Sequence, residues 1–96
     1  MSDVNEQIKE PDFNFFVTTM AIQASICLGV FPNPANNQKE ENLTQAKFII
    51  DTLAMIKDKT KNNLNPEEEK LLENVLSELR MQYVSKTNAK EQEGKK

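Results

Sequence analysis

The sequence predicts an all-α fold: a three-helix protomer with helices at about residues 12–29, 42–61 and 65–85, frayed tails, and pairing into a helical dimer. Apolar residues recur at intervals of three and four in each segment, which is the spacing of a helix face. No segment of useful length alternates with the two-residue period of a strand. Stretches rich in proline and asparagine separate the segments and cannot continue a helix.

The chain length allows one domain between two tails. Ninety-six residues suffice for a single hydrophobic core. Residues 1–11 are polar and mostly acidic and end in Pro11, which indicates a flexible N-terminal arm. We therefore assign residues 12–85 to a single helical domain. The charged tail 86–96 lacks apolar spacing, so we predict that it is disordered.

The first predicted helix has a start signal and a stop signal. Asp12 can accept hydrogen bonds from the N–H groups that open the helix. Gly29 supplies the left-handed residue at which helices commonly end, and Pro32 and Pro34 follow it. No charged residue occurs between Phe13 and Gln38.

The other two helices begin with capping sequences. Asn42, with Gln45 three positions later, is a variant of the capping box. The segment Asn65-Pro66-Glu67-Glu68 places a capping residue before a proline at the first helical position. Residues 67–69 are all glutamates and stabilise the positive end of the helix. Because three neighbouring glutamates point in different directions, they do not indicate a metal site.

The second and third helices each present one apolar stripe with polar residues on the other sides. The stripe of the second helix consists of Leu43, Ala46, Ile49, Ile50, Leu53 and Ile56. The stripe of the third consists of Leu72, Val75, Leu76, Leu79 and Tyr83. Phe48 and Met55, one heptad apart, project from nearly the opposite side of the second helix.

The first helix is apolar on more than one side. Its broad face consists of Phe13, Phe16, Val17, Met20, Ala21, Ala24, Cys27 and Leu28. Its back carries Phe15, Ile22 and Ile26. Two further helices cannot cover both sides, and each large apolar side chain left in water forgoes roughly 1.5–3 kcal/mol.

We therefore predict a homodimer in which two copies of the first helix pair about a two-fold axis. The predicted interface residues are Phe15, Ile22, Ile26, Phe48 and Met55. The small residues Ala21, Ala24 and Ser25 would let the two backbones approach each other.

Three alternatives to a dimer remain open at this stage. The chain could be a monomer with an exposed apolar patch, could bind an unidentified protein partner, or could use the first helix on a membrane surface or a hydrophobic ligand. Asn14 and Gln23 interrupt the apolar run, and neither end of it carries a basic cluster, so membrane contact is not favoured. A signal peptide is not expected, because the first eleven residues are acidic.

The residue types argue against a catalytic, metal-binding or nucleic-acid-binding site. The chain has no histidine, and its net charge of −3 does not suit a nucleic-acid partner. Cys27 lies on the apolar face, where a thiol is inert. Lys47 with Asp51 resembles an ordinary surface ion pair, and the lysines at 57, 59 and 61 compensate a helix terminus. We predict a non-enzymatic interaction or assembly module without catalytic, cofactor-binding or metal-binding residues.

The order of motifs resembles a bacterial family catalogued as domain of unknown function 1844. The resemblance covers roughly residues 12–84 and rests on several segments: Phe13-Asn14-Phe15-Phe16, Pro32-Asn33-Pro34, Ile50-Asp51-Thr52-Leu53, Lys59-Thr60-Lys61-Asn62-Asn63-Leu64 and Leu79-Arg80-Met81-Gln82-Tyr83-Val84. It implies a bacterial, cytoplasmic, all-helical protein and assigns no activity. In the family, glycine is usual at the position of Asn62, which implies an open backbone conformation there.

Overall fold

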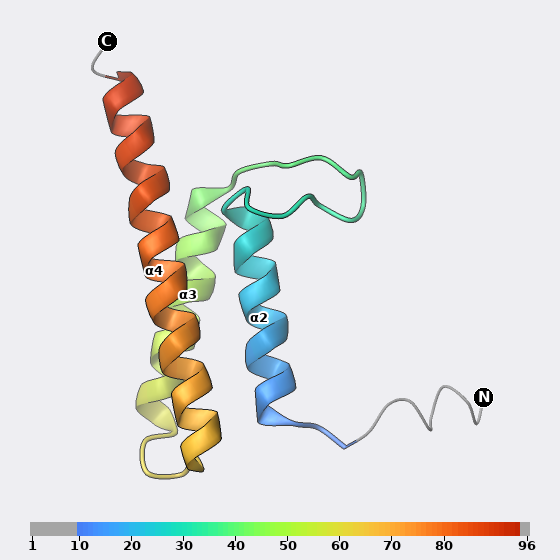
Figure 1. The fold of residues 1–96 in the computed structure, drawn as a ribbon, viewed down its shortest axis with the longest axis vertical. Coiled ribbons are helices and arrows are strands. Elements are labelled where there is room, and N and C mark those ends of the chain that lie inside the picture. The colour runs from blue at the N-terminus through green and yellow to red at the C-terminus, as the bar shows by residue number, and fades with distance from the viewer. Residues whose placement is uncertain (1–9, 95–96) are drawn as a thin grey trace, which may run out of the picture.

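The structure, a computed structural model, describes residues 10–94 and contains three helices (Figure 1). Helix α2 spans Phe13–Cys27, α3 spans Leu43–Lys59 and α4 spans Pro66–Gly94. Residues 10–94 contain no strand, only two isolated antiparallel bridges, between Leu28 and Glu41 and between Asn33 and Gln38. The predicted all-α class and the order of the three helices are confirmed.

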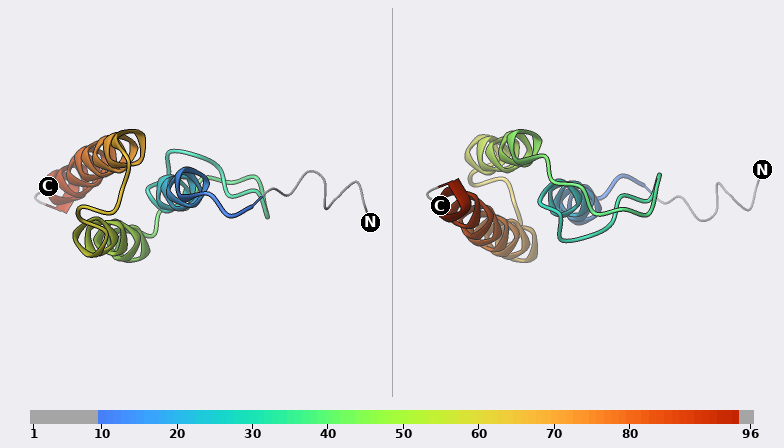
Figure 2. Two further views of the ribbon diagram at one scale, coloured as in Figure 1. Left: turned by 90° about the horizontal axis from the view of Figure 1, so that it is seen from below. Right: turned by 90° about the horizontal axis from the view of Figure 1, so that it is seen from above.

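The helices pack in an up-down-up arrangement, with α2 and α4 running in the same direction and α3 between them in sequence (Figure 1). Seen end-on, they occupy the corners of a triangle, and each packs against both others (Figure 2). The core fills the centre of this triangle. Its buried members are Val17, Ala24, Leu28, Ala46, Ile49, Ile50, Leu53, Leu72, Leu76 and Leu79.

The helix starts follow the predicted capping. The carboxylate of Asp12 accepts from the N–H of Asn14 at 3.0 Å, and the side-chain oxygen of Asn42 accepts from the N–H of Gln45 at 3.1 Å. At the start of α4 the capping box is complete. The Glu68 N–H donates to Asn65 Oδ1 at 2.8 Å, and the Asn65 N–H donates to Glu68 Oε1 at 3.0 Å.

Positive φ angles occur at two positions that the sequence singled out. Gly29 has φ +78° directly after the C-cap of α2. Asn62 has φ +71° in the turn between α3 and α4, which is the open backbone conformation that the family resemblance implied. A third position, Asn37 at φ +58°, lies in the connection between α2 and α3 and was not foreseen.

The prediction that residues 86–96 form a disordered tail was wrong as far as Gly94, because α4 continues to that residue. Most residues after 85 are strong helix formers, and no proline or glycine interrupts them before position 94. Lys86 also forms an ion pair with Glu41 at 3.3 Å, which holds α4 against the end of the α2–α3 connection. Residues 95–96 and residues 1–9 of the predicted flexible N-terminal segment lie outside the described residues.

The broad face of α2 packs inward as predicted, with one exception. Phe16, at the margin of that face, keeps 45% of its surface exposed. Ala24 and Ser25 are buried within the protomer, so they do not serve the approach of a second backbone. Ala21 packs against the same core.

Candidate interaction surface

The outward side of α2 is apolar and exposed. Because α3 and α4 both lie on one side of α2, its opposite side faces away from the bundle (Figure 2). Phe15 is 71% exposed there and Ile22 is 46% exposed. Ile26, on the same side, is partly buried. It lies in the last turn of α2, where the chain folds back and the N–H of Val30 donates to the carbonyl of Ser25 at 2.9 Å.

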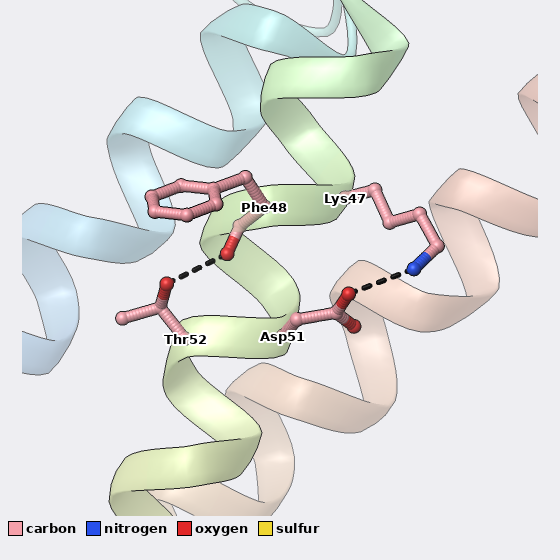
Figure 3. Close-up of polar contacts among 4 residues, drawn as sticks. All are labelled: Lys47, Phe48, Asp51 and Thr52. Atoms are coloured by element: carbon pink, nitrogen blue, oxygen red, sulfur yellow. Dashed lines mark hydrogen bonds and ion pairs between the residues drawn. The ribbon is translucent and has the colours of Figure 1, made fainter.

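A second apolar area borders this side on α3. Phe48 is 66% exposed and Met55 is 50% exposed. Phe48 projects on the side of α3 where α2 lies, whereas Lys47 and Asp51 lie on the side of α4 (Figure 3). We call Phe15, Phe16, Ile22 and Ile26 the α2 face, and Phe48 with Met55 the α3 flank.

Polar contacts around Phe48 are confined to α3 itself. Lys47 Nζ donates to Asp51 Oδ2 at 2.8 Å, four residues along the same helix (Figure 3). This hydrogen bond, with the attraction of the carboxylate, raises the pKa of the Lys47 ammonium. Both side chains are exposed, so the pair adds little to stability. The hydroxyl of Thr52 donates to the carbonyl of Phe48 at 2.7 Å. The surface ion pair is the one that the sequence predicted.

The exposed apolar area of the two regions is comparable to that of an interface. If a large side chain presents about 200 Å² when fully exposed, the α2 face and the α3 flank together leave about 550 Å² of apolar surface in water. One partner of a standard interface contributes about 800 Å², of which about 450 Å² is apolar. The two areas together therefore provide the apolar surface of one such interface.

The connection between α2 and α3 is a braced arm. It projects from the bundle on the outward side of α2, at the helix's C-terminal end (Figures 1 and 2). At its base, the Asn42 N–H donates to the carbonyl of Cys27 at 2.7 Å. At its tip, the Asn33 N–H donates to the carbonyl of Gln38 at 2.8 Å. We call residues 28–41 the arm.

Asparagine side chains hold the tip of the arm in shape. Asn33 Oδ1 accepts from the N–H of Ala35 at 2.9 Å, and Asn36 Oδ1 accepts from the N–H of Gln38 at 3.1 Å. The amide groups of Asn33 and Asn36 also donate to the carboxylate of Glu40, at 3.5 and 3.3 Å. The prolines and asparagines of this stretch predicted only that it does not continue a helix. The repeated asparagines, which favour such side-chain turns, were the signal that this prediction missed.

A cleft of about 440 Å³ lies between the end of α3, the following turn and α4. Leu64, Leu72 and Leu76 contribute its apolar lining. Its charged lining residues balance in sign: Lys57, Lys61, Arg80, Asp58, Glu69 and Glu73. Lys57 and Glu73 form a weak ion pair at 4.0 Å. The cleft therefore has no excess of one charge, and two of the lysines that compensate the end of the second predicted helix, Lys57 and Lys61, contribute to it.

The described residues show no metal-binding cluster, and Cys27 is a free, partly buried thiol. Among the residues whose side chains the structure describes, 10–89, no group of three or more histidine, cysteine, aspartate or glutamate side chains could hold a metal ion. Burial raises the pKa of the Cys27 thiol, so its reactive thiolate is disfavoured. None of the three described helices is long and apolar enough to cross a bilayer.

Further apolar side chains are exposed away from the predicted residues. They are Phe31 on the arm and Met81 and Val84 on α4. They were not among the predicted interface residues, because scattered apolar residues give no pattern that marks a surface. We define the α2 face and the α3 flank together as the candidate interaction surface.

Comparison with known proteins gives one match. A family model described as Domain of unknown function (DUF1844) matches residues 10–85. No curated protein and no solved structure matches the chain. The matched range contains α2, the arm, α3 and the first part of α4, and therefore every residue of the candidate interaction surface.

Proposed function

We propose that this chain, which belongs to the DUF1844 family, is a non-enzymatic assembly module that works as a homodimer. The α2 face forms the centre of the contact, and the α3 flank extends it. The observation that carries the proposal is the exposure of Phe15 and Ile22 on a helix whose other side already fills the core of its own protomer.

Charge favours a second copy over other occupants. The stretch from Phe13 to Gln38 has no charged residue, so two copies of α2 can meet without repulsion. The same stretch offers nothing to pair with a charged protein surface. It also lacks the lysines and arginines that draw an amphipathic helix to anionic lipid. An identical uncharged face is the partner that this surface suits best.

The lack of chemical groups supports a role in assembly rather than catalysis. The chain has no histidine, and its single thiol is disfavoured as a nucleophile. The charges that line the cleft between α3 and α4 balance in sign, and Lys57 and Glu73 among them form an ion pair. The cytoplasmic location implied by the family resemblance stays a prediction.

Two substitutions test the dimer by sedimentation velocity at micromolar concentrations. Ile22→Asp places a carboxylate in the centre of the α2 face, and Thr19→Asp does so at an exposed polar position beside it. Because Thr19 contributes nothing to the protomer core, its substitution keeps the test valid if Ile22→Asp fails to fold. We expect both variants to sediment as monomers. Ser77→Asp adds the same charge at an exposed position of α4 and should remain dimeric.

The outcomes separate this proposal from its alternatives. If Thr19→Asp and Ile22→Asp both fold and remain dimeric, the α2 face is not the interface. A wild-type chain that is monomeric and cosediments with phosphatidylglycerol vesicles, but not after Phe15→Ser, would assign the face to a lipid surface instead. We expect the wild-type dimer to leave such vesicles unbound at both low and moderate salt.

A further inference from the structure

We infer that the two copies pair antiparallel along α2, with the arm of each copy lying beside the N-terminal end of the partner's α2. This inference rests on the proposed homodimer and adds its geometry. The spacing of the outward residues of α2 indicates a helix as the partner, and the sizes of those residues and the position of the arm indicate the antiparallel orientation.

The outward residues of α2 have the spacing of a helix-pairing seam. Phe15, Thr19, Ile22 and Ile26 follow one another at intervals of four, three and four residues. This is the alternation of the two inward positions in a seven-residue repeat, which keeps one line of side chains facing a partner helix. We call these four residues the seam. Its spacing indicates a helix as the partner, rather than a flat surface.

The residue sizes along the seam fit an antiparallel partner. With the pair centred between Thr19 and Ile22, Phe15 meets the partner's Ile26, and Thr19 meets the partner's Ile22. Each phenylalanine and each threonine then faces an isoleucine, so no layer contains two rings or two hydroxyls. In a parallel pair every residue meets its own copy, so the two threonines would form a polar layer inside an apolar contact, and the two Phe15 rings would share one layer.

The arm fits the same arrangement. It projects on the outward side of α2 and only at the C-terminal end of that helix (Figures 1 and 2). In a parallel pair both arms would enter the space between the copies at the same end. In an antiparallel pair the two arms lie at opposite ends of the dimer. Each arm then lies beside the N-terminal end of the partner's α2. Phe31, exposed on the arm, then lies near the partner's first helical turn.

Interactions within the chain hold the arm in shape, which favours its contact with a partner. Its residues 28–38 carry no charge, and the carboxylate of Glu40 accepts from two asparagine amides of the arm itself. The carboxylate of Glu41 pairs with Lys86 on α4. An arm that is ordered before binding loses little conformational entropy when it contacts a partner.

Cysteine cross-linking distinguishes the two orientations. In a Cys27→Ala background, Phe15→Cys and Ile26→Cys are prepared separately, then tested alone and after mixing in denaturant and refolding together. In an antiparallel pair the two Phe15 positions lie eleven residues apart along the axis, about 16 Å, whereas Phe15 lies opposite the partner's Ile26. A disulfide requires Cα atoms within about 7 Å.

We expect oxidation to cross-link the mixture at least about tenfold faster than either variant alone, since only the mixture brings the thiols within disulfide range. Ser77→Cys in the same background serves as the control for random collision. Faster cross-linking of Phe15→Cys alone than of the mixture would overturn the antiparallel orientation. Dimers by sedimentation without cross-links in any sample would overturn the seam. Because Phe15→Cys itself removes an apolar ring from the proposed contact, the homodimer is judged on the wild-type chain. A wild-type chain that sediments as a monomer would overturn the homodimer, so the two failures are distinguishable.

Discussion

Replacement of Phe15 by serine separates the contribution of this side chain to the dimer from its contribution to the fold. Phe15 is 71% exposed in the protomer, so about 140 Å² of its surface is available to a partner, if a fully exposed ring presents about 200 Å². The remaining part, about 60 Å², packs against its own chain. Serine removes the ring and leaves a short polar side chain that α2 tolerates at this position.

The two parts have different energetic consequences. At about 25 cal/mol per Å², burial of the exposed part is worth about 3.5 kcal/mol for each copy. If half of that area is covered in the dimer, two copies lose about 3.5 kcal/mol together, which weakens dimerisation by a factor of several hundred. The part packed within the protomer accounts for at most about 1.5 kcal/mol of its free energy of unfolding.

Sedimentation equilibrium gives the dimer dissociation constant, and urea unfolding at low micromolar concentration gives the stability of the protomer. Thr18→Ser, on an exposed neighbour of Phe15, is the matched control and should leave the dissociation constant within a few-fold of wild type. A Phe15→Ser variant with an unchanged dissociation constant would refute the assignment of the α2 face. A large loss of protomer stability would show that Phe15 belongs to the core.

Three further predictions test the structure of the protomer. Asn65→Ala removes one half of the capping box at the start of α4 and should lower the free energy of unfolding by about 1 kcal/mol. Thermal unfolding measures this loss against the control Asn74→Ala on the same helix, and an unchanged midpoint would contradict the cap. Gly29→Ala forces a side chain into φ +78° and places a Cβ 2.9 Å from Glu41 Cγ, so it should cost at least about 1–2 kcal/mol, and no loss in urea unfolding would show that this backbone conformation is wrong. Because burial raises the pKa of Cys27, alkylation of the native protein should be slow at neutral pH and accelerate only above the pH at which a free thiol ionises; a rate equal to that of the unfolded chain at neutral pH would contradict its burial.

The sequence predicted most reliably those features that depend on residues close together in the chain. The caps at Asp12, Asn42 and Asn65 depend on side chains that reach only two or three residues along the chain, so their geometry follows from the residue types. The same holds for the exposure of Phe48 and Met55. Their position opposite the stripe of α3 excludes them from a core that lies on the other side.

The errors came from features that depend on the rest of the fold. Helix periodicity could not show where α4 ends, because residues 86–94 continue the helix by propensity and by the ion pair between Lys86 and a distant Glu41. Phe16 was assigned to the inward face from its angle alone. It remains half exposed because the neighbouring helices do not extend around α2 to that margin.

The shape and direction of the arm also could not be predicted from the sequence. Its prolines and asparagines predicted that no helix would form. Its shape depends on which amide reaches which carboxylate across several residues, as in the bonds from Asn33 and Asn36 to Glu40. The direction in which it projects depends on how α2 and α3 pack, and a single sequence does not contain that information.

The molar mass of the wild-type protein in solution tests the central claim most directly. Light scattering after size exclusion, over a concentration series that extends into the micromolar range, should give twice the 11.0 kDa of one chain. A single species of 11.0 kDa throughout that series would contradict the claim that α2 needs a second copy to cover its outward face.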